Sequence, residues 1–309
     1  AKYGAEIMPS QAKLNTEIMY NKMDVFGKLI SWYGLVGFVL LMLLMVQIFK
    51  PEWKFKWPVR IGIGLIVIGF LFHTIGLAMR WYISGHAPWS NGYESVIYIA
   101  WATVLAGLLF SRKSAITLGA TSILAAWILI VSMMSWADPQ ITNLVPVLKS
   151  YWLTIHVSII TSSYGFLAIG AILAFMNLLL IILRKNKDAG SRLSLTINEL
   201  SSVIESSLII GLFLLTIGTF LGGVWANESW GRYWGWDAKE TWSMVSILVY
   251  TFIVHTRFIP GLKTVYAFNL LSFVGFASII MTYFGVNFYL SGLHSYATGD
   301  PPIFPLWAW

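Results

Sequence analysis

Eight apolar runs, most of them close to 20 residues long, follow one another along this chain and decide its fold class. They lie near residues 27–49, 59–80, 93–110, 115–134, 152–183, 203–223, 242–259 and 265–290. A helix rises about 1.5 Å per residue, so about 20 apolar residues cross the hydrocarbon core of a bilayer. With 58% hydrophobic and 11% charged residues, the sequence predicts an all-α polytopic membrane protein and excludes a soluble domain.

Lysine and arginine fall unevenly between the apolar runs, and this predicts the orientation. Twelve of them lie in the connections after the odd-numbered runs, against four after the second, fourth and sixth. The positive-inside rule places the richer connections in the cytoplasm, so both termini should face outward. We expect two parts, an outward polar lead-in at 1–26 and an eight-helix membrane domain at 27–309 with an outward loop at 221–242. Because the chain begins with Ala, we also expect it to be cut from a larger protein.

Charge and cysteine content exclude two classes of function. The net charge is +7, but the basic residues form short clusters between apolar runs, where membrane topology already accounts for them. We therefore expect no nucleic-acid partner. The chain has no cysteine, so it offers no thiolate to a metal or a substrate. Any thiol in its chemistry has to come from a partner.

Residues 221–242, LGGVWANESWGRYWGWDAKETW, are the most unusual stretch of the chain. Five of the sixteen tryptophans lie here: Trp225, Trp230, Trp234, Trp236 and Trp242. Trp and Tyr collect at headgroup level in any membrane protein, so an interfacial belt is the alternative interpretation. Five indoles interspersed with glycines, Arg232 and Lys239 favour a platform that stacks on a planar conjugated ligand and holds its polar rim.

Two of the outward connections carry signals for a helix start. Asn91 followed by Glu94, and Asp237 followed by Glu240, have the spacing of a capping box. Capping alone would explain both pairs. For Asp237 a role toward the ligand stays open, since the two roles are compatible.

Three histidines are candidates at the predicted outer face. His156 lies a few residues into the fifth apolar run, and His294 follows the eighth. A lone histidine at a helix end is usually interfacial, but two at the level of an aromatic platform favour a bis-imidazole axial pair for a haem iron. His86, in an outward connection, is a third candidate ligand, a pocket-wall residue or a solvated side chain.

Two further histidines, His73 and His255, lie inside apolar runs. An ionisable side chain is costly there, which makes each a functional candidate. Their depths differ by about ten residues of helix, or about 15 Å, so an axial pair between these two would be strained. We expect a partner for His255 on a segment that precedes this chain.

Several motifs together resemble a known family. The segment 230–242, WGRYWGWDAKETW, with Trp225 ahead of it, resembles the WWD motif of haem-handling proteins. The sequences HAPWSNGYES from residue 86, WLTIHV from 152 and GLHSY from 292 are similar to its CcsA/ResC branch, which belongs to the System II pathway of cytochrome c biogenesis. The similarity covers nearly the whole chain after residue 26. One departure is Ala238, where the family usually has proline, a residue that favours a helix start and supplies no ligand.

The resemblance implies a protein of the bacterial cytoplasmic membrane that carries haem b outward and presents it at the periplasmic face to apocytochrome c. There the CysXxxXxxCysHis thiols would form thioethers, which is holocytochrome c synthase activity. His156 and His294 would match the outer axial ligands, and His255 one intramembrane ligand. The histidine that pairs with His255 would belong to a CcsB-like part. Residues 1–26 look like the tail of that part. A thiol reductase would keep the substrate cysteines reduced.

The residues expected to hold haem are His73, His86, His156, His255 and His294, with Trp225, Trp230, Arg232, Trp234, Trp236, Asp237 and Trp242. Arg232 or Lys239 would pair with the propionates. No acid–base pair stands out, so no catalytic residue is assigned.

Two other functions remain alternatives. A membrane electron carrier of the cytochrome b type would need two histidine pairs stacked across the membrane and permanently bound haem. A haem exporter or chaperone would pass haem on without forming thioethers. Covalent haem on a cytochrome c reporter, in a host with only this pathway, would separate that function from ligation.

Overall fold

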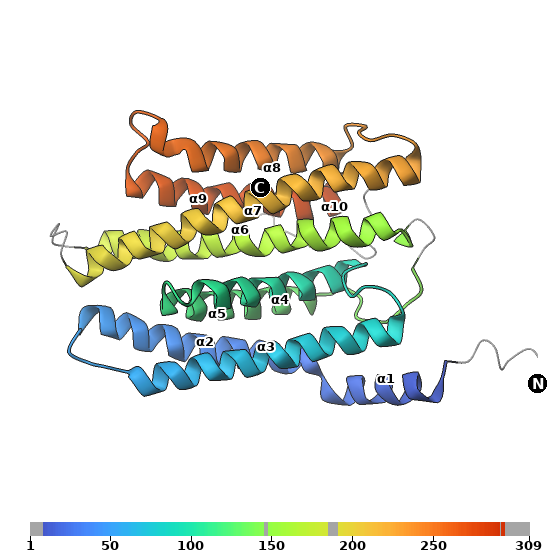
Figure 1. Ribbon diagram of the computed structural model, residues 1–309, viewed down its shortest axis with the longest axis horizontal. Helices are drawn as coiled ribbons and strands as arrows, with labels where there is room; N and C mark the ends of the chain where they lie inside the picture. The colour runs from blue at the N-terminus through green and yellow to red at the C-terminus, as the bar shows by residue number, and fades with distance from the viewer. Residues whose placement is uncertain (1–8, 145–147, 185–190, 291, 294–309) are drawn as a thin grey trace, which may run out of the picture.

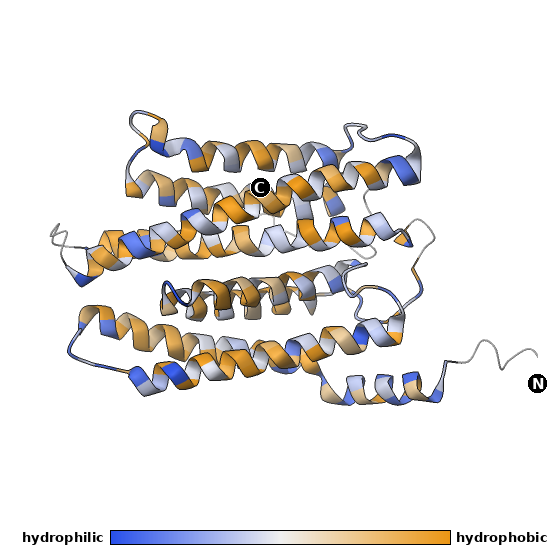
Figure 2. Ribbon diagram, viewed as in Figure 1, coloured by the Kyte–Doolittle hydropathy of each residue, from blue (hydrophilic) through white to orange (hydrophobic). Residues whose placement is uncertain are grey.

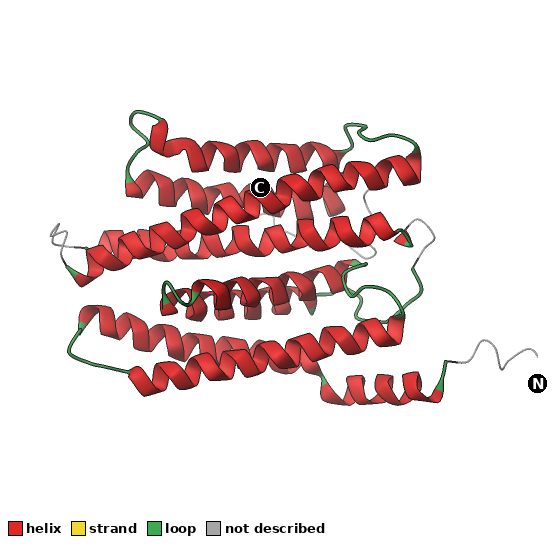
Figure 3. Ribbon diagram, in the orientation of Figure 1, coloured by secondary structure: helices red, strands yellow, loops and turns green. Residues whose placement is uncertain are grey.

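The computed structural model describes residues 9–144, 148–184, 191–290 and 292–293. Its elements are α1 (Gln11–Met23), α2 (Val25–Phe49), α3 (Lys56–Ser84), α4 (Gly92–Phe110), α5 (Ala115–Ser132), α6 (Tyr151–Leu183), α7 (Arg192–Trp230), α8 (Ala238–His255), the 3-10 helix η2 (Thr256–Phe258), α9 (Val265–Ile280), the π-helical turn η3 (Met281–Gly285) and α10 (Val286–Tyr289). The described part contains no strand (Figure 3).

The long helices form antiparallel pairs that lie side by side in a row (Figure 1). The order across the row is α2 with α3, α4 with α5, α6 with α7, and α8 with α9. One end of the row carries the connections 50–55, 111–114 and 256–264 and the described residues of 184–191, and we call it the basic end. The opposite end carries the connections 85–91 and 231–237 and the described residues of 133–150, and we call it the tryptophan end. The alternation of ends is the one that the sequence predicts.

Seven helices of the described chain are long and apolar enough to cross a membrane: Gln11–Phe49, Lys56–Ser84, Gly92–Phe110, Ala115–Ser132, Tyr151–Leu183, Arg192–Trp230 and Val265–Tyr289. The all-α polytopic fold is therefore confirmed, with seven such helices where the sequence suggested about eight. The remaining expected run, the seventh at 242–259, forms α8, whose first turn carries Lys239 and Glu240. Hydrophobic residues predominate along the middle of the helices, and polar residues are more frequent toward their ends (Figure 2).

Two boundaries differ from the sequence-based expectation. The stretch 184–202, between the fifth and sixth expected runs, is partly helical, because α7 already begins at Arg192. There Ser191 Oγ accepts from the backbone N of Ser194 at 3.2 Å. The tryptophan loop expected at 221–242 is shorter, because α7 continues to Trp230 and ends at Gly231 with φ +71°. A left-handed residue of this kind is a common helix stop. Two of the five tryptophans, Trp225 and Trp230, thus lie on α7, and Trp242 lies on α8.

The helices of the row approach one another closely where small residues lie between them. A Cβ added to Gly37 on α2 would lie 2.8 Å from Ser122 Cβ on α5, and one added to Gly119 would lie 3.1 Å from the backbone N of Leu41. Membrane helices lack a hydrophobic drive toward one another and associate through this kind of backbone approach. The α2 and α5 packing therefore depends on glycine at both positions.

The start of the described chain is helical. Ser10 caps α1, and Asp24, with φ +41°, separates α1 from α2. Figure 1 shows α1 reaching past α2 at the tryptophan end. The division into a lead-in at 1–26 and a membrane domain stays a prediction.

Candidate haem-handling site

A cavity of about 540 Å³ opens at the tryptophan end of the bundle. Residues from α4, α6, α7, α8, η3 and α10 and from the connections 85–91 and 133–150 line it, so both halves of the chain contribute. Its size lies within the range of small-molecule and cofactor sites, about 300–1,000 Å³. The lining includes His156 and Trp225 among the expected residues.

His156, on the first turns of α6, is fixed by a hydrogen bond to α7. Its Nδ1 lies 2.6 Å from the carbonyl oxygen of Gly218 on α7. Because a carbonyl only accepts, Nδ1 carries a proton, as it commonly does in metal-ligating histidines. A Cβ on Gly222 would lie 2.6 Å from His156 Cε1, so glycine at 222 makes room for the ring.

Trp225 forms the wall behind this histidine. Its ring stacks on the imidazole of His156 at 6.4 Å between centroids and 8° between planes, and its side chain is 1% exposed. Trp230 meets Trp225 edge to face at 4.8 Å. Trp225 is thus a rigid support that the helix positions, rather than part of an open loop.

The other tryptophans lie farther out. Trp234 lines the cavity and meets Trp236 edge to face at 5.8 Å. Trp236 is 68% exposed and has φ +58°, an uncommon conformation for a tryptophan that directs the chain into α8. Trp242, already on α8, accepts a hydrogen bond from Thr282 Oγ1 at its carbonyl at 3.1 Å and does not line the cavity. The five tryptophans therefore do not form a single platform in which all rings have the same role.

The expected capping box at Asp237 is confirmed. Asp237 Oδ1 accepts from the backbone N of Lys239 at 2.9 Å, and Glu240 Oε2 accepts from the backbone N of Asp237 at 3.2 Å. The second oxygen of Asp237 accepts from the backbone N of Leu293 at 2.6 Å. Asp237 thus caps α8 and also fixes the chain one residue before His294, which itself lies outside the described residues.

Arg232 lies beside the cavity wall rather than in it. Its Nη1 is 3.4 Å from Glu240 Oε1, and its guanidinium lies 5.7 Å from the centre of the Trp230 ring. Glu240 Oε2 also accepts from the backbone N of Gly235 at 2.7 Å. Glu240 is therefore committed to shaping the connection 231–237, with Arg232 packed over it.

Among the described residues that line the cavity, Lys239 is the one lysine or arginine. Its Nζ donates to Asn287 Oδ1 on α10 at 2.8 Å. Burial lowers the pKa of the Lys239 ammonium from its ordinary 10.5 to about 8, against the negative charge of Asp237, which raises it. Lys239 lies in the first turn of α8, ahead of the apolar stretch that starts at Trp242.

The two histidines within apolar runs differ from each other. His73 is fully buried, with Nδ1 3.5 Å from Tyr33 Oη and Nε2 3.1 Å from the carbonyl oxygen of Ile97. Both ring nitrogens have protein partners, so His73 links α2, α3 and α4. His255 is exposed at the basic end, and its Nδ1 donates to the carbonyl of Thr251 at 2.7 Å. Haem roles for both stay predictions.

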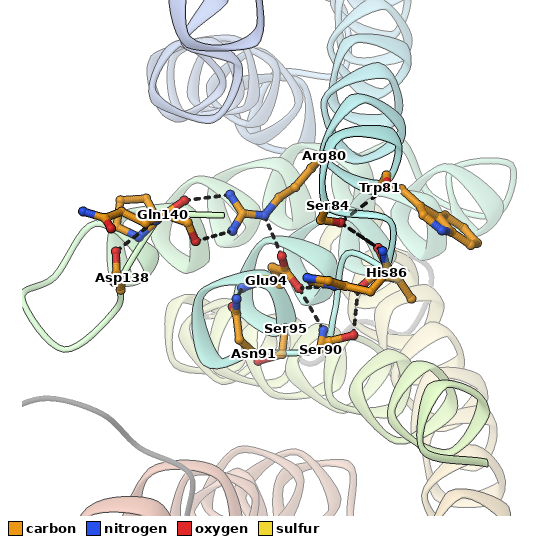
Figure 4. Close-up of polar contacts among 12 residues, drawn as sticks. Arg80, Trp81, Ser84, His86, Ser90, Asn91, Glu94, Ser95, Asp138 and Gln140 are labelled. Atoms are coloured by element: carbon orange, nitrogen blue, oxygen red, sulfur yellow. Dashed lines mark hydrogen bonds and ion pairs between the residues drawn. The ribbon is translucent and has the colours of Figure 1, made fainter. Parts of the chain in front are cut away.

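A buried ion pair, which the sequence reasoning missed, organises the wall formed by the first half of the chain (Figure 4). Arg80 Nε donates to Glu94 Oε1 at 2.8 Å, and both side chains are fully buried. Arg80 Nη1 and Nη2 donate to the carbonyls of Pro139 and Gln140 at 2.8 and 3.2 Å. The guanidinium lies 4.9 Å from the centre of the Tyr93 ring. Arg80 thus joins the first turn of α4 to the connection 133–150, which lines the cavity.

Glu94 carries more than the expected capping role. Asn91 Oδ1 accepts from the backbone N of Glu94 at 2.8 Å, but Glu94 Oε2 accepts from the backbone N of Ser90 at 3.0 Å and not from Asn91. Only half of the expected capping box is therefore formed. An arginine and a glutamate inside apolar runs were the sequence signal for this pair, because such charges need partners.

His86 lies beside this pair and does not line the cavity. Its Nδ1 donates to the carbonyl of Ala87 at 3.2 Å and lies 3.7 Å from Glu94 Oε2. Its Nε2 is buried and has no hydrogen-bond partner among the described residues. Nearby, Trp89 Nε1 donates to the carbonyl of Thr154 on α6 at 3.0 Å, two residues before His156. The connection 85–91 is thus tied to the helix that carries His156.

Comparison with known proteins places this chain in a family. The family model described as "Cytochrome C assembly protein" matches residues 89–294. Protein NrfI of Wolinella succinogenes is 50% identical over 301 residues, which are 97% of this chain and 33% of NrfI. The cytochrome c biogenesis proteins CcsA of Prochlorococcus marinus (strain MIT 9301) and Synechococcus sp. (strain CC9605) are 34% and 35% identical, over 90% and 87% of this chain and 96% and 97% of their own lengths. The chain thus spans about a third of NrfI and nearly all of CcsA. It is an integral membrane protein of the cytochrome c assembly protein family, a CcsA-type chain with a role in cytochrome c biogenesis.

Proposed function

We propose that this chain holds haem b in the cavity at the tryptophan end and presents it for thioether attachment to the CysXxxXxxCysHis thiols of apocytochrome c. The observation that carries the proposal is His156, which faces a cavity of about 540 Å³ with its Nδ1 proton bound to Gly218 and its ring backed by Trp225. A planar ligand in that cavity would meet one imidazole ring and one rigid indole wall.

The residues divide the work of holding the substrate. His156 binds the haem iron on one side, and His294 is the proposed ligand on the other. Trp225 and Trp234 border the macrocycle, and Arg232 at the rim pairs with a propionate. Most of the rate effect comes from orientation, because a fixed vinyl group turns an encounter with a thiol into a local reaction. The thiols come from the substrate, since the chain has no cysteine.

The basic end faces the cytoplasm in this proposal, and the cavity faces the periplasm of a bacterial cytoplasmic membrane. His255, exposed at the basic end, takes a second haem together with a histidine of a CcsB-like part. That part joins this chain to form the active synthase. A thiol reductase on the outer side supplies reduced cysteines.

Expression in a host that lacks its own cytochrome c assembly genes tests this function. The chain is produced with a CcsB-like part and a cytochrome c reporter, and covalent haem on the reporter is measured after denaturing electrophoresis. We expect His156→Ala and His294→Ala each to reduce both haem on the purified chain and covalent haem on the reporter. Haem on the chain without covalent haem on the reporter would indicate an exporter or chaperone. Normal maturation in both variants would refute the ligand assignment.

A further inference from the structure

We propose that Lys239 carries the proton in the thioether-forming step, a role that rests on the proposed function above. Lys239 lines the cavity, and its Nζ is held by Asn287 Oδ1 at 2.8 Å. Because the amide oxygen only accepts, this bond persists when the amine is neutral. One N–H then points to Asn287, and the lone pair remains to accept a proton.

The other titratable groups that line the cavity are committed elsewhere or hold their protons. They are His156 and Tyr164 on α6, Tyr93 on α4, Tyr283 on η3, Glu240 on α8 and Asp138 after α5. His156 keeps its Nδ1 proton on Gly218, and both oxygens of Glu240 are bound within the connection 231–237. The Tyr283 hydroxyl lies 2.6 Å from Ser95 Oγ. Phenols ordinarily titrate near pH 10, so the three tyrosines hold their protons near pH 7.

The carboxylates near Lys239 are also occupied. Asp138 is exposed and caps the backbone N of Gln140 at 2.9 Å. Asp237, two residues before Lys239, binds the backbone N of Lys239 and of Leu293. Lys239 is therefore the group of the described cavity lining that is best placed to gain and lose a proton.

The acidity of Lys239 suits a thiol substrate. With a pKa of about 8, about one Lys239 amine in ten is neutral at pH 7, whereas an ordinary lysine is neutral about three times in ten thousand. A cysteine thiol titrates near 8.5, so proton transfer between the two is nearly balanced. Lys239 thus serves first as base and then as acid.

The step balances without any oxidant or reductant. Lys239 Nζ accepts the thiol proton as the sulfur bonds to the vinyl carbon next to the ring. Nζ then returns that proton to the terminal vinyl carbon. One S–H bond and the vinyl π bond are broken, and one C–S bond and one C–H bond are formed. Lys239 is neutral again for the second thiol.

A single-turnover experiment tests the role. The complete synthase, loaded with reduced haem, is mixed with a CysXxxXxxCysHis peptide at pH 6 to 10, and thioether formation is followed by the haemochrome spectrum. For Lys239→Met we expect unchanged haem loading and a rate at pH 7 about 100-fold lower, since general acid–base catalysis contributes at least this much. The gap should narrow toward pH 10, where the thiol ionises unaided. Lys149→Met is the matched control, because Lys149 is an exposed lysine outside the cavity lining.

Lys239→Arg separates proton transfer from simple pairing with a propionate. Arginine keeps the positive charge but does not lose its proton, so we expect it to react as slowly as Lys239→Met. Ethylamine should restore part of the rate to Lys239→Ala. A Lys239→Arg rate near that of the wild type, or equal pH profiles for all variants, would overturn the inference and leave the proposed function standing. If the wild type forms no thioether, the proposed function fails and the inference with it.

Discussion

Replacing Gly222 with alanine should displace His156 without disturbing the rest of the bundle. The new Cβ would lie 2.6 Å from His156 Cε1, whereas ordinary van der Waals contact begins at 3.4 Å. The ring would have to move by about 0.8 Å, the difference between these two distances. It cannot do so freely, because Nδ1 is bound to Gly218 at 2.6 Å and Trp225 stacks on the ring.

The expected magnitude follows from the cost of misplacing a metal ligand. Disturbing the outer-shell support of a ligating histidine typically lowers metal affinity 10- to 100-fold. We expect haem retention by Gly222→Ala to fall by about that factor, measured as haem per protein and as the six-coordinate absorption spectrum in detergent. Alanine also favours a helix by about 1 kcal/mol over glycine, so the loss would not come from a weaker helix.

Two comparisons make this prediction specific. Gly64→Ala on α3 adds the same methyl group where no atom lies within 4 Å, so haem should be unchanged. In the His156→Ala background, Gly222→Ala should have no further effect, because the ring it displaces is gone. Wild-type haem occupancy and spectrum in the single variant Gly222→Ala would refute the placement of His156 as a ligand.

Two further comparisons test the walls of the cavity. Glu94→Ala leaves Arg80 buried without its carboxylate and should cost about 3–5 kcal/mol of stability, seen as a lower unfolding temperature in detergent. Glu205→Ala, the control, breaks an exposed ion pair that contributes about 0–1 kcal/mol. Equal shifts in unfolding temperature for the two variants would contradict the role of the buried pair. Trp225→Ala should cost about 3–5 kcal/mol because its side chain is 1% exposed. Trp236→Ala, at a 68% exposed position, should keep the unfolding temperature and lower haem occupancy; unchanged occupancy would make Trp236 an ordinary interfacial aromatic.

The sequence alone determined the class of fold and much of the local structure. Long apolar runs cannot leave their backbone polar groups unpaired in lipid, so helices were the available structure for them. The alternation of basic and tryptophan-rich connections fixed which ends lie together. Asp237 and Glu240 predicted the start of α8, because a capping box depends only on residues three apart. His156 was identified from its position at a helix end, although not its partner Gly218.

The tertiary structure alone decided which side chains share the cavity. The Arg80 and Glu94 pair, the stacking of Trp225 on His156 and the bond from Lys239 to Asn287 all join residues on different elements. Their relative positions follow from how the helices pack, and sequence spacing carries no such information. Burial then set the chemistry, since the same lysine has a lowered pKa inside the cavity and an ordinary one in water. The sequence named the candidate haem-handling residues, but the packing of the helices assigned Trp225 to the wall, Trp236 to the surface and Lys239 to the cavity lining.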